Sequence, residues 1–222
     1  MKAAFFFAIL GALARTAEGQ DRFYAPVISC FDAKKQPPPK AETLRTPMLA
    51  SPDARCRAYA QIDATFDETA SQQCRTKAQL FVSSGKSSFK AVFEETTSEK
   101  NAFAVSLGPI AWSPNSRWLA VERAAGNYAS DFGGLDLVLY DSTTGTVSTP
   151  DVLGTIEKYL ARKCVLGYGS FRGFDARNRI MMRVFDWQDD NGKETHCIDG
   201  TAEWLFNPGT GAVQNTARDS PF

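Results

Sequence analysis

The chain has a single histidine, His196, among its 222 residues. Ser–His–Asp and Cys–His mechanisms need a histidine base beside the nucleophile, but His196 lies between Thr195 and Cys197, and the chain has no Gly-x-Ser-x-Gly elbow. A zinc site there would need more ligands, and only Cys164 could join His196 and Cys197. The sequence therefore predicts no catalytic residue, no metal and no cofactor.

An excess of charge of either sign is also lacking, since 25 basic residues balance 25 acidic ones. Residues 1–19 hold Lys2, Arg15 and Glu18, so the remainder has 23 basic (25 − 2) and 24 acidic (25 − 1) residues. Proteins that bind nucleic acid neutralise its phosphates with a basic excess. We therefore expect no nucleic acid partner. The 43% hydrophobic content indicates a folded globular chain.

A hydrophobic run long enough to cross a bilayer is missing too. The run from Ala3 to Ala14 follows Lys2 and precedes small residues, which is typical of a secretory signal peptide. We expect a signal peptide at residues 1–19 and an exported protein, periplasmic or extracellular, with no membrane span. The stiff, Pro-rich segment Ala33–Lys40 predicts that residues 20–43 form an N-terminal strand and a connector before a repeat domain at 44–222.

What the sequence does have is an internal repeat. Three stretches align, SPDARCRAYAQI from Ser51, SPNSRWLAVERA from Ser113 and FDARNRIMMRVF from Phe174. The alignment equates Asp53, Asn115 and Asp175, at spacings of 62 (115 − 53) and 60 (175 − 115) residues. A second landmark follows in each unit, an apolar run that ends in a glycine turn at Gly85, Gly145 or Gly211. The pattern predicts three units, at about 44–102, 103–163 and 164–215.

Each unit predicts a small antiparallel sheet. A lead-in strand, a turn and a second strand are expected at Leu44–Leu49 and Arg57–Ile62, at Phe103–Trp112 and Trp118–Arg123, and at Val165–Phe171 and Ile180–Trp187. A third strand and a hairpin with a fourth, clearest at Ser88–Glu94, complete each unit. The strands are apolar on both faces, which indicates sheets that are covered on both sides. The predicted fold is all-β, mainly antiparallel, with three propeller-blade-like units of about 60 residues.

The second unit carries a resemblance. Ser113–Val121, followed by Leu137–Asp141 and Thr144-Gly145, resembles a blade of the β-propellers in the Tol-Pal protein TolB and in prolyl-oligopeptidase-type peptidases. The resemblance implies architecture only, because the motif carries no chemistry and the peptidase half of those enzymes is absent from this chain.

Closure of such a propeller usually takes four to eight blades, and only three units are visible. Three arrangements are compatible with only three units: an open or distorted stack, two chains that complete a ring of six, or added strands from Arg22–Phe31. We favour an open stack of a monomer, helped by the N-terminal strands, over the ring-completing dimer. A β-sandwich with coincidental turn motifs is the alternative to the repeat.

One segment, near 150–163, breaks the β pattern. Thr149 is a candidate N-cap and Pro150 a candidate first helical residue, and five apolar residues share one face: Val152, Leu153, Ile156, Tyr159 and Leu160. We predict a short helix that packs in the core between the second and third units, with a partner-binding helix as the alternative.

All five cysteines follow the expected signal peptide, where disulfides are favoured. In the repeat, Cys56 opens a second strand and Cys74 precedes the third strand of the same unit. Cys197 has nearly the place of Cys74 in the third unit, while Cys164 opens the first strand of that unit. We predict the disulfides Cys56–Cys74 and Cys164–Cys197, which leaves Cys30 unpaired.

The long loops between second and third strands, at 63–76, 124–134 and 186–201, are expected to emerge on one side of the molecule and to carry function. Six of their residues are candidate contacts for a protein partner or a small ligand: Asn127, Tyr128, Asp131, Phe132, Trp187 and Asp189. The alternative is that the aromatic rings fold back into the core. The sequence favours a non-catalytic exported binding protein, of inhibitor or immunity type among other kinds, over a secreted hydrolase or isomerase that uses loop carboxylates.

Overall fold

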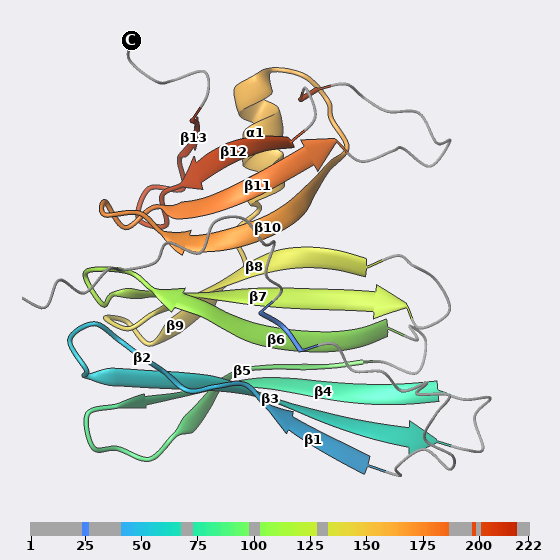
Figure 1. The fold of residues 1–222 in the computed structure, drawn as a ribbon, viewed down its shortest axis with the longest axis vertical. Coiled ribbons are helices and arrows are strands. Elements are labelled where there is room, and N and C mark those ends of the chain that lie inside the picture. The colour runs from blue at the N-terminus through green and yellow to red at the C-terminus, as the bar shows by residue number, and fades with distance from the viewer. Residues whose placement is uncertain are drawn as a thin grey trace, which may run out of the picture.

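The computed structural model describes residues 24–26, 41–67, 73–97, 103–127, 133–186, 197–198 and 201–216. These residues form three antiparallel β-sheets that stack in chain order, with one helix behind the third sheet (Figure 1). The predicted all-β class with one short helix is confirmed, and the three sheets are compatible with propeller-like blades. Within the described part of the chain, no helix is long and apolar enough to cross a membrane.

The first sheet has the strand order β1-β3-β4-β5, with β2 also paired to β3. Its strands are β1 (Ala41–Arg45), β2 (Leu49–Ala50), β3 (Cys56–Asp67), β4 (Gln73–Ser84) and β5 (Lys90–Thr96). The expected lead-in strand at Leu44–Leu49 is divided into β1 and β2. The strand is interrupted at Pro47, because the proline nitrogen has no hydrogen to donate to a neighbouring strand. β1 also begins three residues earlier than expected, where Ala41 pairs with Thr65.

The second and third sheets each have four strands in simple chain order. The second contains β6 (Phe103–Trp112), β7 (Trp118–Asn127), β8 (Gly133–Asp141) and β9 (Thr146–Ser148). The third contains β10 (Leu166–Phe174), β11 (Ile180–Asp186), β12 (Thr201–Phe206) and β13 (Val213–Asn215). Each of these sheets is therefore a meander of hairpins, as the repeat predicts.

Two apolar clusters hold the stack together. The first and second sheets meet through small side chains on β3, Ala58 and Ala60, against larger ones such as Leu107 and Val121 on the second sheet. A second cluster joins the opposite face of the second sheet to the helix and the third sheet, and contains Leu137, Leu139, Ile156, Phe171, Ile180, Met182 and Trp204. The middle sheet is thus buried on both faces, which explains its continuous apolar strands.

The helix α1 (Val152–Leu160) connects the second sheet to the third. Val152 and Ile156 are buried in the second cluster, so the predicted core packing of this helix is confirmed. The predicted cap is wrong by two residues: Asp151, rather than Thr149, is the N-cap, and its carboxylate accepts a hydrogen bond from the Gly154 N–H at 2.9 Å. A carboxylate is well placed there because the helix dipole is positive at that end.

Candidate functional site

The repeated turn is the best-defined local structure of the molecule. In the second unit, the Ser113 hydroxyl donates to Asn115 Oδ1 at 2.7 Å and accepts from the Trp118 N–H at 2.8 Å, while the Arg117 N–H donates to Asn115 Oδ1 at 3.2 Å. The first unit makes the same three bonds from Ser51 and Asp53. These polar side chains are used to close the turn, so the motif is architectural.

The third turn corrects the sequence alignment. Backbone bonds from Ser51 N–H, Ser113 N–H and Asp175 N–H close the three turns, and each of these residues accepts through its carbonyl from the residue three further on. Asp175 therefore has the place of Ser113, not of Asn115, and the true spacing is 62 residues twice (113 − 51 and 175 − 113). The Asp175 carboxylate replaces both side chains, because its Oδ1 accepts from the N–H groups of Arg177 and Arg179.

Neighbouring turns are also bonded to one another. The residues at the left-handed position of each turn are Ala54, Ser116 and Asn178, with φ of 57°, 62° and 62°. The Ser116 hydroxyl accepts from the Asp53 N–H at 3.1 Å, and the Asn178 amide oxygen accepts from the Asn115 N–H at 2.9 Å. The second and third units thus each supply an acceptor to the unit before them.

This series of contacts ends at both terminal units. At the first unit, the side chain of Ala54 has no polar atom that could accept a hydrogen bond from a preceding unit. At the third unit, the Arg177 N–H has the donor position, but it already donates to Asp175 of its own turn. The described turns therefore form a series of three units with no matching donor or acceptor for a fourth.

The predicted contact residues lie at or after the ends of β7 and β11 in the sequence. Strands β3, β7 and β11 all end on the right-hand side in Figure 1. The predicted loop bounds at 63–76 and 124–134 are wrong, because β3 continues to Asp67 and β4 begins at Gln73, while β7 continues to Asn127 and β8 begins at Gly133. Asn127 is the last residue of β7. Tyr128, Asp131, Phe132, Trp187 and Asp189 lie outside the described residues. Their use in binding stays a prediction.

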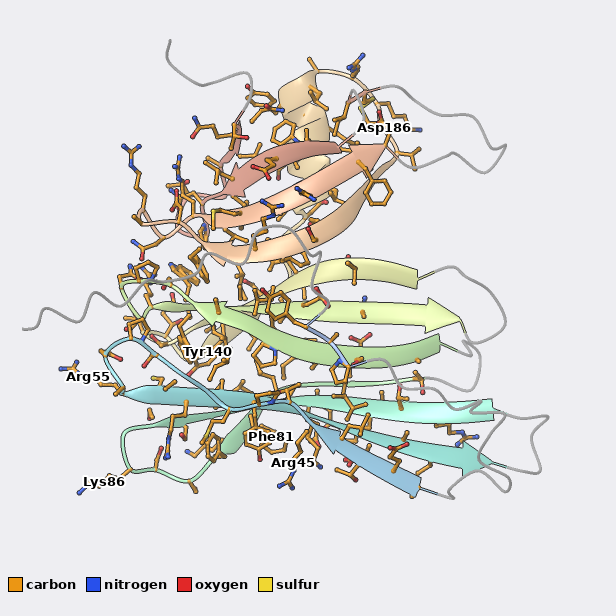
Figure 2. The ribbon with its side chains drawn as sticks, viewed as in Figure 1. Arg45, Arg55, Phe81, Lys86, Tyr140 and Asp186 are labelled. Carbon is orange, nitrogen blue, oxygen red and sulfur yellow. A yellow bond between two sulfur atoms is a disulfide. The ribbon has the colours of Figure 1, made fainter. Side chains whose placement is uncertain are left out.

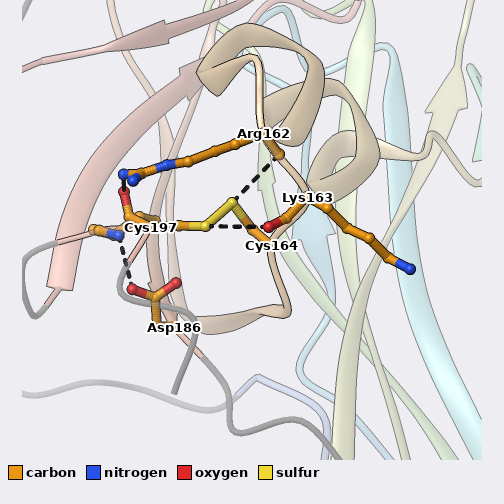
Figure 3. Close-up of a disulfide and its surroundings, with 6 residues drawn as sticks. Arg162, Lys163, Cys164, Asp186 and Cys197 are labelled. Carbon is orange, nitrogen blue, oxygen red and sulfur yellow. Dashed lines mark hydrogen bonds between the residues drawn. A yellow bond between two sulfur atoms is a disulfide. The ribbon is translucent and has the colours of Figure 1, made fainter. Parts of the chain in front are cut away.

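The predicted cysteine pairing is half right. Cys164 and Cys197 form a disulfide, with a Cα–Cα distance of 6.0 Å, that ties the chain after α1 to the chain before β12 (Figure 3). Arg162 donates to the Cys197 carbonyl oxygen, and Asp186 Oδ2 accepts from the Ile198 N–H at 2.7 Å. The cross-link and these bonds fix the edge of the third sheet.

The predicted Cys56–Cys74 disulfide is wrong. Cys56 is a buried free thiol, and burial raises its pKa. In the β3–β4 ladder Cys56 lies opposite Ser84 while Cys74 lies opposite Phe66, so the two cysteines are at opposite ends of a long hairpin. Ten residues of strand separate the two positions, about 33 Å. Cys30 lies outside the described residues.

A buried carboxylate holds the N-terminal segment, of which residues 24–26 are described. Glu122 is 0% exposed, and its Oε1 accepts from the Tyr24 and Ala25 N–H groups, at 3.0 Å each. A Cβ on Gly108 would lie 2.0 Å from the Tyr24 carbonyl carbon, so only glycine permits this close approach. The expected N-terminal strand is not seen in these three residues, which lie across the face of the second sheet instead.

One cavity of about 280 Å³ lies between β8, the start of α1 and β10. Its polar lining includes Arg123, Asp136, Asp151 and Tyr168. Arg123 is bound by Glu95 at 2.6 Å and by Asp136 at 2.5 Å, and Asp151 caps α1. Burial, with the nearby Asp136 and Asp151 charges, raises the pKa of Tyr168. These groups stabilise the junction of the sheets, and they offer no free acid and base pair.

Another polar and aromatic surface is the first-sheet outer face, by which we mean Arg45, Arg57, Tyr59, Phe81 and Phe89. Tyr59 stacks on Phe81 at 5.1 Å between ring centroids and meets Phe89 edge to face at 5.0 Å. The Arg45 guanidinium lies 5.8 Å from the Tyr59 ring centre, and that of Arg57 lies 5.5 Å from the Phe89 ring centre. Figure 2 shows Arg45 and Phe81 pointing away from the second sheet, and Tyr140 lying between the sheets.

Sequence reasoning missed this face, although a signal was present. Along β3, Arg57, Tyr59 and Gln61 alternate with buried Ala58, Ala60 and Ile62, the period of a strand with one covered and one open face. A search for nucleophiles, bases and metal ligands passes over such residues.

Groups of three or more metal-ligating side chains are absent from the described residues. Comparison of the chain with protein family models, curated proteins and solved structures gave no match. The function must therefore be inferred from the surfaces themselves.

Proposed function

We propose that this protein is an exported, non-catalytic binding protein that contacts a protein or a small ligand through the loops between second and third strands. The observation that carries the proposal is the common side on which β3, β7 and β11 end (Figure 1). We expect the segments that follow these strands to form a contact surface together, whereas the opposite side is closed by turn-to-turn bonds.

The chemistry of the described residues supports binding rather than catalysis. Three of the buried or bonded carboxylates have structural roles, since Glu122 holds the N-terminal segment, Asp141 pairs with Arg117 at 2.8 Å, and Asp175 closes a turn. The Cys164–Cys197 disulfide is compatible with an exported protein. The likeness to TolB-type blades supports a scaffold role and adds no chemistry.

Affinity capture from the native compartment tests the proposal. The full chain is compared with a variant in which residues 128–132 are replaced by Gly and Ser, and with a turn variant, Arg55→Ala/Arg177→Ala. We expect one protein or ligand to be enriched by the full chain and the turn variant and lost with the loop variant. Equal capture by all three chains, or turnover of a substrate panel by the full chain, would contradict the proposal.

A further inference from the structure

The first-sheet outer face carries positive charge that the described structure does not neutralise. Arg45 Nε donates to the neutral Gln61 amide at 2.8 Å, and no carboxylate of the described residues lies within ion-pair distance of Arg45 or Arg57. Glu94 is neutralised by Lys77 at 3.0 Å, whereas Asp63 accepts only from the neutral Thr43 hydroxyl, at 2.7 Å, and from the Gln61 amide. Arg45, Arg57 and Asp63 together leave this face with one positive charge (2 − 1), and neither guanidinium has a carboxylate partner.

The aromatic groups give the face an apolar centre between these charges. Tyr59, Phe81 and Phe89 contact one another and are only partly buried, and no described element covers them (Figure 1). Tyrosine and arginine are enriched among the residues that contribute most to protein–protein binding, because they combine apolar area with directed hydrogen bonds. Arginine in particular binds carboxylates with two parallel hydrogen bonds.

We propose that the first-sheet outer face docks a partner protein that presents carboxylates around an apolar centre. The inference rests on the proposed function of binding, but it assigns a contact to a surface separate from the loops. Each guanidinium would pair with a partner carboxylate while the aromatic cluster packs against the partner's apolar residues.

Other occupants fit the geometry less well. Nucleic acid needs a basic excess, and the chain has none. A sugar ring needs an open aromatic face, whereas Tyr59 is covered by Phe81 on one side and approached by Arg45. A second copy of this chain, docked face to face, would bring the unneutralised guanidinium groups of both copies together, which opposes association.

The test uses a soluble random copolymer of glutamate and tyrosine as the probe, because it presents carboxylates beside aromatic rings. Binding to the full-length protein is measured by fluorescence anisotropy, with a lysine–tyrosine copolymer as the probe of opposite charge. We expect binding of the glutamate copolymer only. The affinity should fall about tenfold in Arg45→Ala/Arg57→Ala and also with rising salt, which screens the ion pairs.

The matched control is Arg55→Ala/Arg177→Ala, which removes the same charge from two exposed arginines of the turns. It should bind the copolymer as the unmodified chain does. No binding, or equal weakening in both double variants, would overturn the proposal, and so would concentration-dependent dimerisation that Arg57→Glu abolishes. Affinity capture that survives Arg45→Ala/Arg57→Ala but not loop replacement would overturn this docking site and leave the proposed function intact.

Discussion

The outer faces of the first and third sheets are both formed by antiparallel strands, but their arginines have different partners. On the third sheet, Arg172 and Arg183 converge on Glu203, at 2.9 and 3.7 Å. On the first sheet, Arg45 and Arg57 lie against aromatic rings with no described carboxylate within ion-pair distance. The two arginines of the third sheet share a carboxylate of their own sheet, whereas those of the first sheet have none within ion-pair distance and stay available to a partner.

The two ends also differ in what anchors them. The third sheet packs its inner face against α1 and is cross-linked at one edge by Cys164–Cys197. The first sheet has no described helix on its outer face, and its Cys56 is a free thiol. A stack of repeats needs covered or polar end surfaces. A partly apolar end that stays open therefore marks a surface for interaction.

The largest expected difference between the ends is the cost of losing a cysteine. Cys164→Ser/Cys197→Ser removes a cross-link over 33 residues, which should lower the free energy of unfolding by about 3 to 4 kcal/mol. Cys56→Ser should cost about 1 kcal/mol or less, because no covalent bond is lost. Urea denaturation of both variants measures the two values. Similar losses would show that the ends do not differ in this respect.

The second-largest expected effect is the loss of stability when a hydrogen bond between neighbouring turns is removed. Asn178→Gly and Ser116→Gly keep the left-handed backbone, which glycine tolerates, but remove the acceptors of the Asn115 and Asp53 N–H groups. Each should cost about 1 kcal/mol in urea denaturation. The control is Ala54→Gly at the open end of the series, which removes no acceptor and should leave stability unchanged or higher. A comparable loss in all three variants would show that the inter-unit bonds contribute nothing.

A third prediction concerns Glu122, which joins the N-terminal segment to the second sheet. Burial raises the pKa of this carboxyl, while bonds from the Ala25 and Tyr24 N–H groups oppose the rise. A carboxyl with a raised pKa stabilises the fold at low pH, and this contribution is lost as the pH rises through its folded value. Glu122→Gln should therefore gain stability relative to the unmodified chain as the pH rises above the usual pKa range of a glutamate carboxyl.

Thermal unfolding of both proteins at a series of pH values measures the trend. Glu122→Ala, which deletes the acceptor altogether, should be less stable at every pH because the Tyr24 and Ala25 N–H groups lose their partner. A Glu122→Gln variant that loses stability relative to the unmodified chain as the pH rises would show that the carboxylate is favoured as an anion.

The smallest expected effect is a difference in how salt changes the stability that the arginines of the first and third sheets contribute. Glu203→Ala on the third sheet should cost up to about 1 kcal/mol at low salt and less at high salt, since exposed ion pairs are screened. Arg57→Ala on the first sheet should cost about 0.5 kcal/mol with little salt dependence, because only contact with Phe89 is lost. Chemical denaturation at two salt concentrations distinguishes them. Equal salt dependence would mean that Arg57 is paired.

Much of the fold could be predicted from the sequence. The Ser-Pro-Asn turn at Ser113 and the glycine turns are local signals, so the three sheets and their turns followed directly from them. The third turn was misaligned by two residues because Asp175 replaces two side chains at once, an equivalence that only the hydrogen bonds reveal.

Long-range features were beyond local reasoning. The distance of Cys56 from Cys74 depends on the register of the β3–β4 ladder, and the contact of Glu122 with Tyr24 joins residues 98 positions apart. The first-sheet outer face was missed because it consists of aromatic rings and guanidinium groups from several strands, which come into contact only when the sheet forms.

Hydroxyl-radical footprinting of the full-length monomer, read by mass spectrometry, tests most directly the claim that the first sheet leaves its outer face open. Tyr59, Phe81 and Phe89 should be oxidised readily, while Phe171 and Trp204, at 1% and 0% exposed, should be protected. Protection of Tyr59, Phe81 and Phe89 to the level of Trp204 in the unbound monomer would contradict the account.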